Sequence, residues 1–284
     1  MRIIIAILFL SPATLWHVLV EQFLQPESQP PLSTVLTLLD PLVAFVLFLV
    51  AYHLYCRVIE KRPALEISSP GSLPELGVGF LIGAGMMAFM VGVISVPGYY
   101  RIESFNPDSW ILVMNLPAVG IAAFAEELLF RLIVFKLSEE LLGSWLAIMI
   151  QAVYFALAHM GNPDASVETT LLLLISAGVL LAAAYMYTRR VWLVLGIHVS
   201  WNYFQSTVFG LPTSGKPADG WIKPVIDGPV WLTGGEYGIE ASYMATLLVL
   251  VVGIVILRKA IGRGQVVAPV WKRKRVIVAS SGRD

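Results

Sequence analysis

The sequence predicts an all-α membrane protein, a polytopic bundle of about eight transmembrane helices with the N- and C-termini on the cytoplasmic side. Hydrophobic residues make up 57% of the 284 positions and charged residues 13%, about half of the roughly 25% charged residues in a soluble domain. Apolar stretches recur at lengths near the roughly 20 residues that a helix needs to cross the hydrocarbon core. Lys and Arg gather on alternate connections, which indicates the orientation.

Eight apolar stretches reach or approach membrane-spanning length. They are 4–24, 35–56, 77–98, 112–136, 144–159, 169–187, 191–209 and 241–257. The first is the weakest, because Ser11, Pro12 and His17 interrupt it. It lacks a small-residue cleavage site after its apolar run, so we expect an uncleaved span rather than a signal peptide.

The distribution of Lys and Arg predicts an N-terminus inside the cell. With this orientation the inner segments carry Arg2, Arg57, Lys61, Arg62, Lys136, Arg189, Arg190, Arg258, Lys259, Arg263, Lys272, Arg273, Lys274, Arg275 and Arg283. The outer segments carry Arg101, Lys216 and Lys223. We therefore expect residues 258–284 to form a basic cytoplasmic tail, which is either solvated or in contact with anionic headgroups.

The chain is predicted to be one transmembrane domain, 1–284, with no internal repeat of the kind found in transporters. Its longest connection, 210–240, is rich in Gly and Pro and is interpreted as an extracytoplasmic loop. The single Cys56 excludes an internal disulfide and a thiolate metal cluster within the chain.

The first group of buried charges is AEELLFR, residues 125–131, inside the fourth predicted span. Glu127 and Arg131 are four residues apart, with the acid first, which favours an intrahelical ion pair. Glu126 lies about 100° around the helix from Glu127, so Arg131 cannot easily pair with both. A charge at the bilayer centre costs about 2.5–3.5 kcal/mol and persists only with partners. One carboxylate therefore needs another partner, which suits a general base.

Two further polar groups follow on successive spans. His159 closes the fifth span in FALAH, and His198 and Asn202 lie four residues apart in HVSWN of the seventh. Taken alone, each group could equally have a structural role, as a helix cap or in hydrogen bonding between helices, or a functional one. Together they bring two carboxylates, two imidazoles and a carboxamide into one bundle, which favours a functional site.

The remaining intramembrane acid is Asp40, which has no second aspartate to form a catalytic dyad. Its depth matches that of His17 in the first span, so we expect a structural contact between the two. The chain also lacks the GxSG, GxGD and HExxH motifs of other proteases.

The ordered motifs resemble those of the CPBP family, the CAAX-processing and bacteriocin-processing (Abi-type) intramembrane peptidases. The family pattern EExxxR, FxxxH and HxxxN matches Glu126, Glu127 and Arg131, then Phe155 and His159, then His198 and Asn202. The motif-bearing core spans about 112–209. Each motif is short, but the ordered set is specific, and it is similar to the type II CAAX prenyl endopeptidases.

This resemblance implies an intramembrane endopeptidase that hydrolyses a membrane-tethered or lipid-modified protein or peptide. Glu126 and His159 would activate water, and His198 and Asn202 would form the oxyanion site. Glu127 and Arg131 would support Glu126. Eukaryotic relatives imply a cytosolic opening of the site, whereas the sequence itself leaves the side undetermined.

Three alternatives stay open. Zn²⁺ is possible with Glu126, His159 and His198 as ligands, although we favour no cofactor. The chain could instead be an inactive family member that acts as a membrane scaffold or immunity protein, or a proton-coupled transporter. The expected partners are the lipid bilayer and a membrane-bound protein or peptide, with no nucleic acid, and the expected location is a bacterial-type cell membrane.

Overall fold

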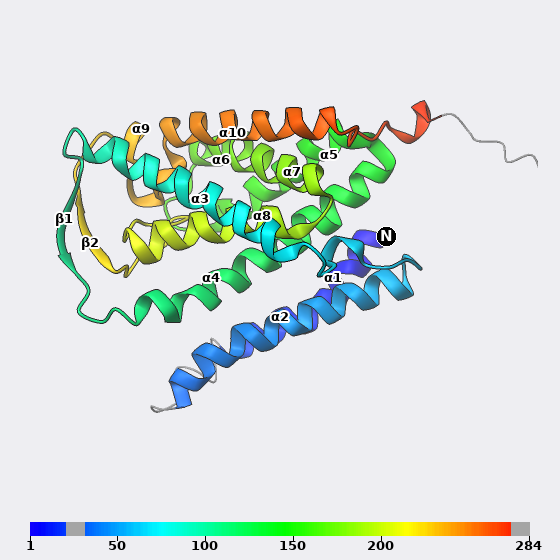
Figure 1. The fold of residues 1–284 in the computed structure, drawn as a ribbon, viewed down its shortest axis with the longest axis horizontal. Helices are drawn as coiled ribbons and strands as arrows, with labels where there is room; N and C mark the ends of the chain where they lie inside the picture. Colours follow the sequence, from blue (N-terminus) through cyan, green and yellow to red (C-terminus); the bar gives the residue numbers. More distant parts are fainter. Residues whose placement is uncertain (21–31, 274–284) are drawn as a thin grey trace, which may run out of the picture.

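The chain folds into a bundle of long, oblique helices that is closed at one end by a two-stranded antiparallel sheet (Figure 1). The structure, a computed structural model, describes residues 1–20 and 32–273. Its longer elements are α1 (Arg2–Leu19), α2 (Leu32–Val58), α3 (Ser72–Ser95), β1 (Tyr100–Phe105), α4 (Ile111–Glu127), α5 (Lys136–Ala158), α6 (Val167–Ile175), α7 (Ala177–Thr188), α8 (Val191–Asn202), β2 (Ile222–Ile226), α9 (Val230–Thr233) and α10 (Tyr243–Gly262). Two π-helical segments, Leu128–Phe135 and Tyr203–Val208, continue α4 and α8.

Six helical stretches within the described residues are long and apolar enough to cross a membrane, which indicates an integral multi-pass membrane protein. They are Arg2–Leu19, Val35–Val58, Ser72–Ser95, Ile111–Gly161, Val167–Thr188 and Tyr243–Gly262. The predicted spans 112–136 and 144–159 both fall in the fourth stretch, which turns at Gly143 (φ 79°, ψ 168°). The end of the predicted first span, 21–24, lies outside the described residues.

The predicted seventh span, 191–209, is helical from Val191 to Val208, as α8 and the π-helical segment that continues it. It is not among the six stretches that are long and apolar enough to cross a membrane. Val191 and all of 193–198 are buried, so protein rather than lipid surrounds this part of α8.

Glycines bring α3 and α8 into close contact. A Cβ atom at Gly79 would lie 2.2 Å from the carbonyl oxygen of Leu193, and one at Gly196 would lie 2.2 Å from that of Leu76. Small residues at such crossings let helix backbones approach each other in membrane proteins. Because His198 follows Gly196 by two positions, α3 fixes the depth and rotation of the helix that carries this imidazole.

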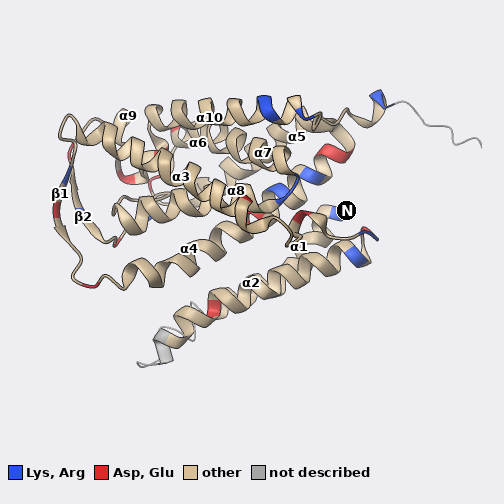
Figure 2. Cartoon of the chain, viewed as in Figure 1, with Lys and Arg blue, Asp and Glu red and all other residues tan. Residues whose placement is uncertain are grey.

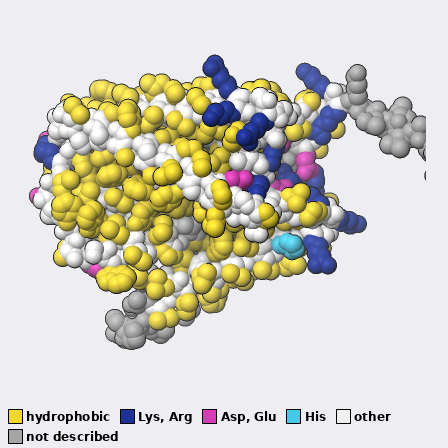
Figure 3. All heavy atoms as spheres, viewed as in Figure 1, with side chains coloured by type: hydrophobic (Ala, Val, Ile, Leu, Met, Phe, Trp, Pro, Cys, Tyr) yellow, Lys and Arg dark blue, Asp and Glu magenta, His cyan; other side chains and the backbone are white. Residues whose placement is uncertain are grey.

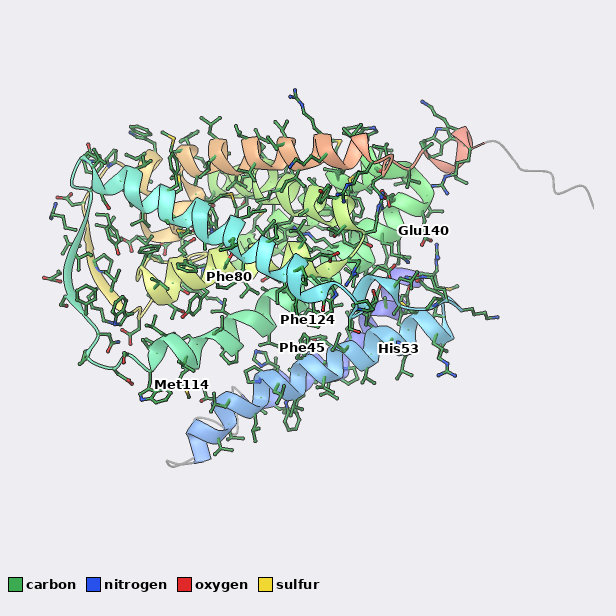
Figure 4. All side chains as sticks on the ribbon, viewed as in Figure 1. Phe45, His53, Phe80, Met114, Phe124 and Glu140 are labelled. Atoms are coloured by element: carbon green, nitrogen blue, oxygen red, sulfur yellow. The ribbon has the colours of Figure 1, made fainter. Side chains whose placement is uncertain are left out.

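α1 and α2 form a pair at one side of the bundle, beside α4 (Figure 1). His17 Nδ1 lies 2.6 Å from Asp40 Oδ2, which confirms the predicted contact. Phe45 of α2 packs on Phe124 of α4 with ring centroids 4.6 Å apart (Figure 4). These contacts attach the pair to the helix that carries the motif glutamates.

The connection 210–240, interpreted from the sequence as an extracytoplasmic loop, contributes one strand. β2 pairs antiparallel with β1, with Tyr100 opposite Ile226 and Phe105 opposite Ile222. The Tyr100 hydroxyl donates a hydrogen bond to the Phe209 carbonyl at 2.9 Å. The sheet therefore ties the connection after α8 to the one before α4.

Charged residues gather at the opposite end, around the N-terminus of α5 and the C-termini of α2 and α7 (Figure 2). Lys136 Nζ lies 2.9 Å from Glu60 Oε2, and Arg62 Nη1 lies 2.9 Å from Glu66 Oε2. Arg189 pairs with Glu139. This end is polar and cross-linked by ion pairs.

The first part of the predicted basic tail packs on the protein. α10 continues to Gly262, and the segment after it crosses the turn at Gly143. Val267 pairs with Ser144 there, accepting from its N–H at 3.0 Å and donating to its Oγ at 2.8 Å. The predicted tail therefore begins as helix and packed chain, and residues from 274 onward lie outside the described part.

Hydrophobic side chains cover much of the flank of the bundle (Figure 3). Leu81 is 74% exposed on α3, and Leu73 is 77% exposed. Lipid tails can solvate such surfaces. The exposed apolar flank is therefore consistent with the multi-pass assignment.

Candidate active site

The two motif glutamates lie in the last turn of α4, where the helix widens into the π-helical segment Leu128–Phe135. Such segments are rare and frequently lie at functional sites. Glu127 and Arg131 are completely buried, whereas the Glu126 side chain is 34% exposed. The adjacent carboxylates therefore face different surroundings.

Glu127 lies at the centre of a buried polar network. Its Oε1 accepts hydrogen bonds from Arg131 Nη1 at 3.2 Å and from His198 Nδ1 at 2.7 Å. The Arg131 guanidinium carbon lies 4.7 Å from the centroid of the Phe155 ring, a cation–π distance. The predicted pair between Glu127 and Arg131 is present, and it extends to the imidazole of α8.

The hydrogen bonds of the two histidines indicate their tautomers. His159 Nδ1 lies 2.7 Å from the Phe155 carbonyl oxygen, which can only accept, so Nδ1 carries a proton. His198 Nδ1 donates to the Glu127 carboxylate in the same way. In the neutral form of each ring, Nε2 then has a free lone pair.

Both Nε2 atoms lie near Glu126. His159 Nε2 is 4.0 Å and His198 Nε2 is 3.8 Å from Glu126 Oε2. This oxygen is buried and has no hydrogen-bond partner among the described residues. A water molecule at hydrogen-bonding distance, about 2.8 Å, could bridge it to either imidazole.

His159 and His198 both approach Glu126, although their positions along the chain imply different depths if the sixth predicted span crosses fully. That span, Val167–Thr188, is long enough to cross a membrane. It is divided into α6 and α7 at Ser176 (φ −87°, ψ −82°). The oblique course of α4 and α8 relative to α10 is visible in Figure 1.

Two cavities adjoin the motif residues. The larger, of about 610 Å³, is lined from the helices by Glu126, His159 and Asn202 and from the 210–240 connection by Thr213, Ser214 and Lys216. The smaller, of about 80 Å³, is lined by both imidazoles, Glu126 and Asn202 and by apolar side chains that include Leu173, Leu180 and Val249. Glu126, His159 and Asn202 thus border both cavities, whereas His198 borders the smaller one.

Ser214 and Glu240 reach the site although no motif includes them. Both line the smaller cavity. Glu240 accepts a hydrogen bond from the Ser214 N–H at 2.5 Å and another from the Gln205 amide. Burial raises the pKa of Glu240 to about 7, despite these hydrogen bonds. Glu240 is the acid nearest to the last apolar stretch, but its spacing to other polar residues gives no signal in the sequence.

The geometry also tests the zinc alternative. Donors around a tetrahedral zinc with bonds of about 2.0–2.1 Å lie about 3.3 Å apart, whereas the imidazole nitrogens lie 3.8 and 4.0 Å from Glu126 Oε2. Within the described residues no three His, Cys, Asp or Glu side chains are close enough to hold a metal ion. The residues as placed do not fit a zinc site.

Residues 108–204 match the sequence family described as Rce1-like, type II CAAX prenyl endopeptidase Rce1-like. Over this segment, roughly a third of the chain, the protein is similar to the Rce1-like family. No curated protein and no solved structure matches the chain significantly. The matched segment begins just before α4 and ends just after Asn202, so it contains every motif residue.

The Rce1-like family is a family of proteases, and its name implies membrane protein substrates that carry a prenyl group. The matched segment excludes α1, α2, α3, the 210–240 connection and α10. Ser214 and Glu240 are thus outside the family segment, although both border the cavity that the motif residues form.

Proposed function

We propose that this Rce1-like protein is an intramembrane endopeptidase that hydrolyses a membrane-tethered or lipid-modified protein or peptide. The observation that carries the proposal is the approach of two imidazole Nε2 atoms to the one buried, unpartnered oxygen of Glu126. This arrangement can hold and deprotonate a water molecule, which peptide hydrolysis requires.

In the proposed first step, Glu126 and His159 activate the water. Glu126 Oε2 and His159 Nε2 both act as acceptors and orient the water. Glu126 takes up one proton of the water as its oxygen attacks the carbonyl carbon. The Phe155 carbonyl holds the tautomer of His159 that leaves Nε2 free. Positioned general bases of this kind contribute typically 10²- to 10⁴-fold to the rate.

His198 and Asn202 are proposed to stabilise the oxyanion. Asn202 follows His198 by one helical turn and lines both cavities. With Nδ1 bound to Glu127, a second proton on His198 would place an N–H donor on Nε2 and balance the charges of Glu126, Glu127 and Arg131. Donors oriented before the reaction in a water-poor site are worth about 10²–10³-fold each.

Collapse of the tetrahedral intermediate completes the reaction. The C–N bond breaks, and the new carboxyl group keeps the water oxygen. The proton that Glu126 took up passes to the leaving amine. Glu127 and Arg131 do not contact the reacting atoms in this scheme. They position the His198 imidazole and compensate charge.

The substrate class follows from the family and from the surroundings of the site. The site lies in a bundle with an apolar flank, so a substrate attached to the membrane would be delivered in the plane of the bilayer. We further propose eight membrane-crossing segments, one domain over 1–284 and cytoplasmic termini, supported by the basic residues of the charged end (Figure 2).

Cleavage of membrane-tethered peptides by the purified protein tests the proposal. His159→Ala is expected to abolish cleavage without a change in melting temperature. His53→Ala is the matched control, because His53 is exposed on α2, away from the site (Figure 4). Retained cleavage in the His159→Ala variant would contradict the assigned role. Proton movement across sealed vesicles that depends on His159 would instead favour a transporter.

A further inference from the structure

The larger cavity leads from the motif residues toward the end of the bundle that carries the sheet. α4 runs from Ile111, close to β1, to Glu127, and the cavity-lining residues Ala118 and Ala122 precede Glu126 on it. On the other wall the cavity follows α8 beyond Asn202 to Ser206. Its rim includes Lys216, which is exposed.

The basic residues gather at the other end (Figure 2). Lys61 is exposed there, Lys136 begins α5, and Arg189 and Arg190 connect α7 to α8. At the sheet end the described Lys and Arg residues are Arg101, Lys216 and Lys223. An excess of Lys and Arg marks the cytoplasmic ends of transmembrane segments.

We propose that the catalytic cavity opens to the extracytoplasmic side, so that the substrate is a segment of a membrane-anchored protein exposed outside the cytoplasm. The nature of this substrate rests on the proposed peptidase function, whereas the side of the opening rests on the charge distribution and the course of the cavity. The assignment is opposite to the cytosolic opening implied by the eukaryotic relatives.

The rim supports this direction of entry. Ser214 borders both cavities and has a left-handed backbone, φ 52°. The adjacent Gly215 packs so closely that a Cβ there would lie 1.8 Å from the Pro163 carbonyl oxygen. The connections after α5 and after α8 therefore meet beside the cavity at the sheet end. A peptide entering from that end would pass Ser214 before it reached Glu126.

Accessibility of single cysteines tests the proposal without requiring a known substrate. In a Cys56→Ser background, Lys216→Cys marks the rim of the cavity and Lys61→Cys marks the opposite end. The reagent is a charged, membrane-impermeant maleimide applied to right-side-out vesicles. We expect Lys216→Cys to react in intact vesicles and Lys61→Cys to react only after permeabilisation. The reverse pattern, or no reaction of Lys216→Cys before permeabilisation, would overturn the proposal.

A second pair of variants tests whether the cavity itself is open from that side. Ala122→Cys faces the cavity, whereas Gly120→Cys, on the same helix, faces an apolar groove lined by α2 and α3. Because the thiolate is the reactive form and needs water, Ala122→Cys should react roughly tenfold faster or more from outside. Equal rates would contradict entry by this route. Both labelling experiments test the side on which the cavity opens, and neither depends on catalysis. The His159→Ala cleavage experiment tests the peptidase function separately.

Discussion

At the scale of single residues, the neighbouring glutamates differ because their surroundings differ. Glu127 is enclosed with Arg131 and His198, and Glu126 faces the cavity and the two Nε2 atoms. The helical offset between adjacent positions explains this division, since residues one apart point about 100° away from each other. One carboxylate can thus serve structure while the other serves chemistry.

The buried pair gives a prediction about stability. Glu127→Gln or Arg131→Met alone should cost about 3–5 kcal/mol of unfolding free energy, because each leaves an uncompensated buried charge. The double variant should lose less than the sum of the two. Denaturant unfolding in detergent measures all three, and strictly additive losses would argue against the pair.

Glu240 gives a prediction about pH. Its folded pKa of about 7 is above the ordinary 4.5, so the folded state binds its proton more tightly than the unfolded state does. The contribution to stability is complete below pH about 4.5 and is lost as the pH rises to about 7, at up to about 1.4 kcal/mol per pH unit. Glu240→Gln should flatten this slope in thermal melts across that window. An unchanged slope would show that the carboxyl group is not buried as described.

The sequence predicted the residues of the site better than their arrangement. The spacing of Glu127 and Arg131 and of His198 and Asn202 follows from helical periodicity alone. Ser214 and Glu240 could not be predicted, because they reach the cavity through the long 210–240 connection, whose strand β2 pairs with the distant strand β1. Contacts that are made through such a connection leave no periodic pattern in the sequence.

At the scale of elements, irregular helices carry the candidate site. The π-helical segments after Glu127 and Asn202 and the break at Ser176 each depart from the regular spans expected from apolar length. Length and apolarity predict that a segment is helical and buried in lipid or protein, but they do not distinguish a crossing helix from an enclosed one.

Close packing of α3 on α8 should be sensitive to one methyl group. Gly79→Ala places a Cβ 2.2 Å from the Leu193 carbonyl oxygen, so the helices must separate, at a cost of about 1–3 kcal/mol. Gly85→Ala on the same helix meets no atom within 4 Å and should be neutral or stabilising by up to about 1 kcal/mol.

Melting temperature and peptide cleavage together measure this effect. Both should fall in the Gly79→Ala variant, because α8 carries His198 and Asn202, and both should be retained in Gly85→Ala. Equal behaviour of the two variants would contradict a positioning role for the α3–α8 contact.

At the scale of the whole molecule, the two ends of the bundle have different characters. One end holds most of the ion pairs and most of the described basic residues (Figure 2). The other end holds the sheet and the rim of the cavity. Between them lies an apolar flank that lipid can solvate (Figure 3). The four polar residues of the proposed catalytic group are thus enclosed in a structure that is otherwise adapted to the bilayer.

The central claim is that Glu126 activates the hydrolytic water without a metal ion. The most direct measurement is cleavage of a membrane-tethered peptide by the purified protein and by Glu126→Gln, with and without a chelator. Glu140→Gln is the control, because Glu140 is half-buried and pairs with Arg2 at the charged end (Figure 4). We predict a loss of about 10²-fold or more in Glu126→Gln, unchanged cleavage in Glu140→Gln and no effect of the chelator. Full activity of Glu126→Gln, or loss with chelator that Zn²⁺ restores, would contradict the claim.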